Sequence, residues 1–226
     1  MIVFEDNTPL TEGFDMLFPV GVTLTVDGVR TVTALPEAED VAVYLDTLPA
    51  EELFATETGE ALLSRLAERL TKWGYEAEVT TSTVYQLTDR QQVERRVILP
   101  ASEALRPDHG YENLTDCEPD PMGEGLLCFG TVEDGKILSA ASENPHAEDD
   151  TVIDVGVETA AEHEGKGYAA SNVAALAYYL LDPGVTVTYI VEDDNLPSRR
   201  VAEKVGFTPS TRELRVVAWR GRNDGA

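Results

Sequence analysis

The sequence is poor in cysteine, since its 226 residues include only two, Cys117 and Cys128. Two cysteines cannot build the disulfide framework of a small secreted domain, and these two lack the close spacing of a zinc-binding pair. Two free thiols fit a reducing compartment, so we expect a cytoplasmic protein without a metal site. We expect Cys128 to pack as an apolar side chain rather than to act as a nucleophile.

Long hydrophobic runs are lacking as well. No apolar run in the sequence reaches the roughly 18 residues of a membrane-spanning helix. The opening residues, MIVFEDNTPL, show no basic region followed by an apolar core, so we expect no secretory signal. With 42% hydrophobic and 7% aromatic residues, the chain is expected to fold around a buried core.

Positive charge is scarce. Seventeen Lys and Arg residues face 42 Asp and Glu residues, which gives a formal net charge of −25. Such a chain repels duplex nucleic acid and anionic membranes, so we expect neither as a partner. An acidic surface with few lysines suits a salt-rich cytosol, where a short Debye length screens self-repulsion. Two interpretations stay open: a halophilic protein, or an acidic protein from a GC-rich genome.

The first 92 residues are expected to form a smaller mixed α/β segment, in which we find no chemical constellation. Apolar and polar residues alternate on both sides of Asp27-Gly28, which predicts a hairpin, and a leucine stripe predicts a helix that Gly74 ends. The expected elements are strands 22–26 and 29–32, helices 37–48 and 62–73, and strand 76–87.

Residues 93–226 are expected to form a second domain. The turn 133–135 predicts another hairpin, and strand–helix–strand order after it predicts neighbouring parallel strands joined by a right-handed crossover. We expect polar connections at 91–96 and 144–150, a strand at 97–99 and a loop at 100–121. The other expected elements are strands 125–132, 136–142, 151–159, 185–191 and 212–219, and helices 165–181 and 197–205.

Two glycines, Gly165 and Gly167, precede the long predicted helix. They let the backbone turn tightly and bring its N–H groups close to a ligand. The first helical turn adds unpaired N–H groups at the positive end of the helix dipole, and Lys166 is expected to add the one full positive charge nearby. The loop therefore predicts a phosphate or diphosphate site, although a plain tight turn also accounts for the glycines. Its spacing fits neither a Walker loop nor a dinucleotide fingerprint.

A second polar turn follows strand 185–191. Asn195 stands where the next predicted helix begins, with Pro197 in the first turn, so we expect it to cap that helix. Capping alone, or a contact with the same ligand, accounts for this asparagine. The helix closes with Glu203-Lys204-Val205-Gly206-Phe207.

These two motifs, in this order, resemble those of the GNAT superfamily of N-acetyltransferases. Glu164, Gly167 and Ala169 match that family's [Q/R]-x-x-G-x-[G/A] loop, apart from the first position. Its N-x-x-[S/A] and [Y/A]-E-K-[L/V]-G-F signatures are matched by Asn195-x-x-Ser198 and by 202–207. The resemblance covers about residues 97–219, and 156–169 with the acidic segment before it looks most like the zwittermicin-resistance-type acetyltransferases.

The resemblance implies an α/β (α+β mixed-sheet) acyl-CoA N-acyltransferase fold, in which strands 151–159 and 185–191 splay apart. Acetyl-CoA, as cosubstrate, would lie in the splay, with its pantetheine amides against the first of these strands and its diphosphate on the glycine loop. The implied cofactor-binding residues are Val157, Glu158, Thr159, Glu164, Gly165, Lys166, Gly167, Tyr168, Ala169, Asn195 and Ser198.

Catalysis in the family is direct attack of an amine on the thioester, which needs positioning and a base. A base is needed because an amine with a pKa of about 10 is almost wholly protonated at neutral pH. Glu158 and Asp154 are an even number of residues apart on one predicted strand, so both point to one face. We take these two as candidate bases, with an exposed or salt-bridged carboxylate as the alternative, and Tyr189 as the aromatic candidate in the splay.

Two departures from the family pattern matter. Glu164 stands where Arg or Gln is usual, and its carboxylate weakens the field for a diphosphate. Ala202 stands where many members have a tyrosine that protonates the leaving thiolate. Three hypotheses therefore stay open: an N-acetyltransferase for a small or protein amine, a CoA-binding module without turnover, and a structural domain in which both motifs are coincidental. A homodimer is also left open.

Overall fold

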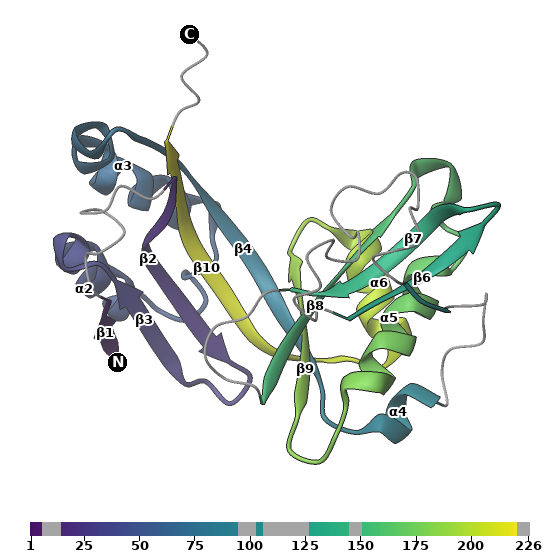
Figure 1. The fold of residues 1–226 in the computed structure, drawn as a ribbon. Helices are drawn as coiled ribbons and strands as arrows, with labels where there is room; N and C mark the ends of the chain where they lie inside the picture. The colour runs from purple at the N-terminus through teal and green to yellow at the C-terminus, as the bar shows by residue number, and fades with distance from the viewer. Residues whose placement is uncertain (6–14, 95–102, 106–126, 145–150, 221–226) are drawn as a thin grey trace, which may run out of the picture. The chain divides into compact units, whose positions relative to one another are not determined.

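The computed structural model describes residues 1–5, 15–94, 103–105, 127–144 and 151–220 (Figure 1). The chain divides into two compact units, which are described separately. Unit 1 comprises Met1–Thr83 and Ser210–Ala226, and unit 2 comprises Val84–Pro209. The predicted strand 97–99 and most of the predicted loop 100–121 lie outside the described residues. The predicted division into segments 1–92 and 93–226 remains a proposal.

Unit 1 is built on a mixed sheet with the strand order β1-β3-β2-β10-β4. β1 runs parallel to β3, whereas β2 is antiparallel to both β3 and β10. The strands are β1 (Ile2–Phe4), β2 (Met16–Thr25), β3 (Arg30–Ala34), β4 (Tyr75–Leu87) and β10 (Thr208–Arg220). β4 ends, and β10 begins, with residues of unit 2.

The local signals of unit 1 give the predicted elements. The hairpin around Asp27-Gly28 is confirmed, with Leu24 opposite Arg30 and Gly28 at a φ of 87°. The leucine stripe lies on a helix that ends at Gly74, whose φ is 78° and whose N–H donates to the carbonyls of Leu70 and Thr71. The helical elements are η1 (Pro36–Ala38), α2 (Glu39–Thr47) and α3 (Thr56–Trp73).

The core of unit 1 lies between these helices and one face of its sheet. Leu62, Leu66 and Leu70 come from one side of α3 and are buried together with alternate residues of β2 and β10. Their spacing of four residues places them in one row on the helix. In Figure 1, α2 and α3 lie beside the same face of these strands.

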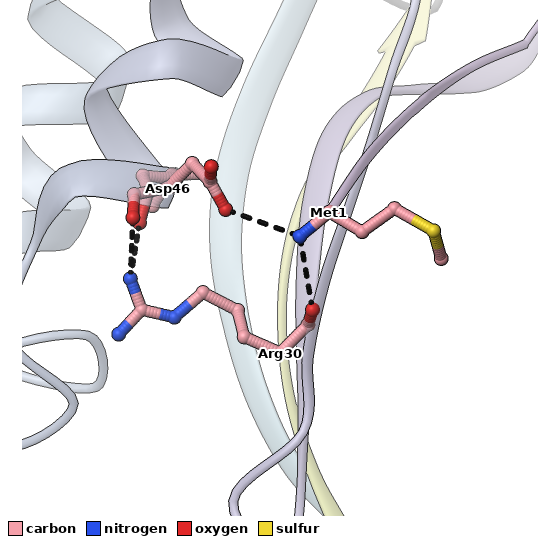
Figure 2. A network of polar contacts seen from close by, with 4 residues as sticks. Met1, Arg30 and Asp46 are labelled. Carbon is pink, nitrogen blue, oxygen red and sulfur yellow. Dashed lines mark hydrogen bonds and ion pairs between the residues drawn. The ribbon is translucent and has the colours of Figure 1, made fainter.

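Figure 2 shows how polar groups join β3 to the end of α2. The guanidinium of Arg30 donates to the backbone carbonyls of Leu45 and Asp46, at 3.1 and 2.8 Å. The amino group of Met1 donates to the carbonyl of Arg30 and lies 3.4 Å from a carboxylate oxygen of Asp46. The last carbonyls of a helix lack partners within the helix, so Arg30 satisfies groups that otherwise need water.

Unit 2 contains a second stretch of mixed sheet, with the strand order β9-β8-β7-β6-β5. β8 and β9 are parallel, as predicted, and the other pairs are antiparallel. Its strands are β5 (Glu103–Ala104), β6 (Cys128–Glu133), β7 (Lys136–Glu143), β8 (Val152–Thr159) and β9 (Thr186–Glu192). Its helices are α4 (Arg90–Glu94), η3 (Ala161–His163), α5 (Tyr168–Leu180) and α6 (Leu196–Val205).

The second predicted hairpin is confirmed, with Asp134 and Gly135 at φ values of 52° and 78°. Two short elements differ from the sequence prediction: α4 forms where a polar connection was expected, and β5 forms within the expected loop. α4 is stabilised by tertiary contacts, because Arg90 pairs with Asp182 at 3.1 Å and lies over the ring of Tyr178. Cys128 is buried, in agreement with its predicted packing role.

Helix α5 packs on one face of the unit 2 sheet. Its buried residues include Val173 and Leu176, and they form one core with Val155 of β8 and Val187 of β9. This core faces the sheet side that carries the odd-numbered residues of β8. The even-numbered residues, among them Asp154 and Glu158, lie on the opposite face. The architecture is a mixed α/β fold on open sheets, as predicted.

Candidate functional site

The parallel pair β8–β9 comes apart partway along its length. The two strands pair at Val152–Thr186, Ile153–Val187 and Asp154–Thr188, and the pairing ends there. Both strands nevertheless continue, β8 as far as Thr159 and β9 as far as Glu192. Parting strands of this kind were predicted from the family resemblance.

Beyond the point of parting, one edge of β8 pairs with no strand of the described residues. On its other side β8 pairs with β7, where the amides of Asn144 and Ala160 mark the hydrogen-bonded positions with Asp154 and Leu138. Because these positions alternate along an antiparallel pair, the even-numbered residues of β8 bond to β7. The backbone N–H and C=O groups of Val157 and Thr159 therefore point to the edge where β9 has moved away. An extended ligand with amide groups can pair with this edge.

The glycine loop leads directly into α5 at the same end of β8. Gly165 and Gly167 have φ values of 72° and 90°, a conformation that side chains other than glycine's disfavour. The first backbone bond of α5 runs from the Ser171 N–H to the Gly167 carbonyl. The preceding N–H groups, from Tyr168 to Ala170, have no carbonyl within the helix to bond to. They form the positive end of α5, as the loop motif predicted.

Two lysines, Lys166 and Lys204, bring positive charge to this loop. The ammonium of Lys204, from the end of α6, would lie 3.5 Å from a Cβ placed on Gly167. The expectation that Lys166 is the one full positive charge near the loop is therefore wrong, since Lys204 is a second. The Lys166 ammonium lies 3.1 Å from Nδ1 of His163, whose ring is 6.1 Å from that of Tyr168. Glu164 is exposed, so its carboxylate is free to face water.

Lys204 was missed because no local pattern brings the end of α6 to the start of α5. The only available signal was its place in the Glu203-Lys204-Val205-Gly206-Phe207 box, which was interpreted as a family signature rather than as a source of charge. Two helices that pack together bring such distant residues close, which a one-dimensional pattern does not show.

Asn195 caps α6 as predicted, since its side-chain oxygen accepts from the Ser198 N–H at 3.1 Å. The residue is exposed, and its side-chain nitrogen remains able to donate to a ligand. Ala202 is fully buried in the α5–α6 core. The alanine therefore has a packing role and brings no hydroxyl to the site.

The two candidate bases share one face of β8, as predicted, but differ in their surroundings. Asp154 accepts from the Asn144 amide at 2.7 Å and from the Thr188 hydroxyl at 3.1 Å. Both of its carboxylate oxygens are thus engaged in joining strands. Glu158 is partly buried, and its Oε2 atom is inaccessible to water and has no hydrogen-bond partner among the described residues. Of the two carboxylates, only that of Glu158 has an oxygen that is not engaged by another described residue.

Tyr189 is the first residue of β9 past the point of parting. It is buried on the α5 side, and its ring centroid lies 5.9 Å from that of Phe207. The structure thus places Val157–Thr159, the glycine loop and Tyr189 around the parted strands, while Asn195 begins the helix that follows β9.

No group of three His, Cys, Asp or Glu side chains in the described residues is arranged to bind a metal ion. No helix among the described residues meets the length and hydropathy that a membrane span requires.

Comparison with known proteins supports the fold. A family model described as FR47-like protein matches residues 133–216, from the β6–β7 turn into β10. A GCN5-related N-acetyltransferase-like protein from Streptococcus suis is similar in structure, with a TM-score of 0.52, 20% identity, and coverage of 70% of this chain and 68% of that chain. No curated protein sequence matches the chain.

Two further solved structures are similar. A conserved protein of unknown function from Staphylococcus epidermidis has a TM-score of 0.52 at 10% identity, over 86% of this chain and 85% of that chain. A GNAT-family acetyltransferase from Colwellia psychrerythraea has a TM-score of 0.47 at 17% identity, over 96% and 90%. The chain thus has the mixed α/β fold of GNAT acetyltransferases, as predicted. The zwittermicin-resistance subgroup stays a prediction.

Proposed function

We propose that the protein is an acyl-CoA-dependent N-acetyltransferase that moves an acetyl group from acetyl-CoA to a primary amine. The observation that carries the proposal is the parting of β8 and β9 next to the free N-terminal turn of α5. An unpaired strand edge suits the amides of pantetheine, and helix N–H groups suit a diphosphate. The two features adjoin in the chain, as a single extended cosubstrate requires.

The residues of the loop would bind the diphosphate. Backbone N–H groups of Gly167 to Ala169 donate to its oxygens, and Lys166 and Lys204 supply charge. The positive charges of these two lysines offset the negative charge of Glu164, which on the sequence alone was expected to weaken diphosphate binding. Val157 and Thr159 would pair with pantetheine, with Asn195 and Ser198 of the α6 start near the cosubstrate as the resemblance implies.

Glu158 would act as the base for the acceptor. Glu158 takes one proton from the acceptor ammonium, directly or through water, and the neutral amine then attacks the thioester carbonyl. A C–N bond forms, the C–S bond breaks, and the nitrogen gives its second proton to water. The leaving thiolate takes a proton from water, since Ala202 supplies none. We assign Asp154 a structural role. We propose that Tyr189 lines the space between the parted strands β8 and β9. The acidic chain favours a cationic acceptor, either a small amine or a protein amine.

One experiment tests binding and another tests turnover. Calorimetry with acetyl-CoA should give a saturable heat, and thiol release over a panel of polyamines, aminoglycosides and lysine peptides should identify acceptors. Lys204→Gln should weaken acetyl-CoA binding about threefold to tenfold, because a charge-assisted contact is lost. Lys136→Gln, at the start of β7 in the same unit, is the matched control and should leave binding unchanged. No heat at millimolar acetyl-CoA would refute the proposal.

A CoA-binding module without turnover is the second candidate. The buried Ala202 favours it, because the site lacks a tyrosine at this position to protonate the leaving group. Saturable acetyl-CoA binding with no thiol release from any amine of the panel would support the module over the enzyme.

A further inference from the structure

Three polar side chains are buried between α5 and the sheet of unit 2. Asn172 of α5 and Ser139 of β7 are both 0% exposed, and Thr131 of β6 is 8% exposed. The other buried residues along this side of α5 are apolar or small, among them Val173 and Leu176. Burying polar groups costs free energy unless every one is hydrogen-bonded, so their contacts need an explanation.

The first two contacts join α5 to two strands. The Thr131 hydroxyl donates to the side-chain oxygen of Asn172 at 3.2 Å. The side-chain nitrogen of Asn172 donates to the backbone carbonyl of Ser139 at 2.9 Å. Asn172 is one turn beyond Tyr168, so it fixes the part of α5 that follows the glycine loop.

The next two contacts lead from Ser139 to the end of β8. Its hydroxyl donates to the backbone carbonyl of Glu158 at 2.9 Å, and it lies 2.8 Å from the hydroxyl of Thr159. A serine hydroxyl has one proton, so the Thr159 hydroxyl must be the donor in the second contact. The orientation of the Thr159 side chain is thereby fixed as well.

We infer that Thr131, Asn172 and Ser139 are positioning residues that hold the free edge of β8 at a set distance from the first turn of α5. The inference rests on the proposed function, in which these two features bind the two ends of one cosubstrate. The chain of bonds runs from the helix to the strand without a break: Thr131 to Asn172, Asn172 to Ser139, and Ser139 to Glu158 and Thr159. A set distance between two binding features removes an ordering cost from ligand binding.

The same bonds distinguish positioning from simple packing. An apolar core would hold α5 on the sheet equally well but would tolerate small shifts of the helix along it. Directional hydrogen bonds among buried groups select one arrangement, since a shifted one leaves groups unsatisfied. None of the three residues needs to touch the cosubstrate to influence its affinity.

Thr131 offers the sharpest test, because it lies on β6, with β7 between it and the β8 edge. Thr131→Val keeps the shape and removes the hydroxyl, whereas Thr131→Ser keeps the hydroxyl and removes a methyl group. We expect Thr131→Val and Ser139→Ala each to raise the dissociation constant for CoA about threefold to tenfold. Thr131→Ser should stay within about twofold of the wild type. Calorimetry with CoA gives the constants, and thermal melts give the stability of each variant.

Val173→Ala is the stability control, since it removes apolar contacts from the same helix without touching the polar chain. We expect it to lower the melting temperature at least as much as Thr131→Val while leaving CoA affinity within about twofold. CoA affinity that follows melting temperature across all four variants would overturn the inference, as would unchanged affinity in Thr131→Val and Ser139→Ala. A wild-type protein that binds no CoA would instead refute the proposed function itself.

Discussion

The hydroxyl of Thr188 on β9 donates to the carboxylate of Asp154 on β8 at 3.1 Å, at the last position where these parallel strands pair. The other carboxylate oxygen accepts from Asn144, just after β7. One carboxylate therefore joins three neighbouring segments at the point of parting. The side-chain oxygen of Asn144 also lies 3.2 Å from a Cβ placed on Gly156, so a larger residue there would displace it.

Replacing Thr188 by Val should loosen this junction and leave the packing of β9 intact. We expect a loss of about 1.5–3 kcal/mol in the free energy of unfolding of unit 2, because one hydrogen bond to a charged acceptor is removed. Asp154→Asn should also cost stability, because the bonds to Asn144 and Thr188 both lose their charged partner even where the new amide turns its oxygen to the first and its nitrogen to the second. Chemical denaturation, followed by circular dichroism, measures both.

The Asp154→Asn variant also distinguishes a structural role of Asp154 from a catalytic role. If the residue is structural, Asp154→Asn retains the pH dependence of thiol release and changes mainly the KM for acetyl-CoA. Loss of the acidic limb of the pH profile, with KM unchanged, would assign Asp154 the role of the base. Glu158→Gln is the comparison variant, and there we expect kcat to fall with little change in KM.

Gly167 should be required for binding as well as for the turn. Gly167→Ala places a side chain at a φ of 90°, which costs roughly 1–2 kcal/mol of stability, and sets a methyl group beside the Lys204 ammonium. We expect CoA affinity to fall about tenfold or more, because the loop amides shift. Calorimetry measures this.

Gly184→Ala is the matched control, since Gly184 has a φ of 93° and open space around its Cβ position. We expect a similar loss of stability without a change in CoA affinity. Equal affinities in the two variants would show that the Gly167 loop does not contact the cosubstrate.

Tyr85 of β4 should make unit 2 sensitive to alkaline pH. Burial raises the pKa of its phenol above the ordinary value of 10.0, and nearby Arg199 opposes the rise while Glu203 and Asp193 add to it. A raised folded-state pKa means that the native state retains the proton that the unfolded chain has lost. The stabilising contribution is complete below about pH 10 and declines as the pH rises through the folded-state pKa.

Thermal melts between neutral pH and about pH 11 should therefore show a steeper loss of stability in the wild type than in Tyr85→Phe. Tyr179→Phe, which changes an exposed tyrosine of the same unit, serves as the control. Parallel curves for the wild type and Tyr85→Phe would contradict the assignment.

The acidic composition leads to a prediction about salt. If the chain is halophilic, raising KCl from about 0.1 M to the molar range should raise the melting temperature well beyond what a neutral protein shows, as the Debye length shortens from about 10 to 3 Å. Thermal melts across a KCl series check this, with NaCl as a comparison. Full stability without salt, or unfolding in molar KCl, would favour a merely acidic protein.

Local chemistry explains why much of the fold was predictable from the sequence. Gly74 ends α3, and the turns at Asp27-Gly28 and Asp134-Gly135 close hairpins, because Gly28, Gly74, Asp134 and Gly135 adopt left-handed backbone conformations. The stripe on α3 and the capping by Asn195 are also properties of short segments. Each of these predictions depends on residues a few positions apart.

The features that the sequence does not predict depend on contacts between residues far apart in the chain. α4 has five residues, too few for a periodic signal, and Arg90 stabilises it through Asp182, far along the chain. The approach of Lys204 to the glycine loop depends on how α5 and α6 pack. Strand pairing likewise engages both carboxylate oxygens of Asp154, whereas Oε2 of Glu158 has no hydrogen-bond partner among the described residues. Sequence spacing predicts the common face of the two residues but not their different surroundings.

The strand order of unit 1 limits how the chain can fold during synthesis. β10 lies between β2 and β4 in the strand order, yet it is the last of the described strands to leave the ribosome. After β4 has been translated, more than a hundred further residues, including nearly all of unit 2, must be translated before β10 is available. Until then β2 and β4 cannot pair with β10. Of the two units, only unit 2 is continuous in sequence, so it is the one that can begin folding on the nascent chain.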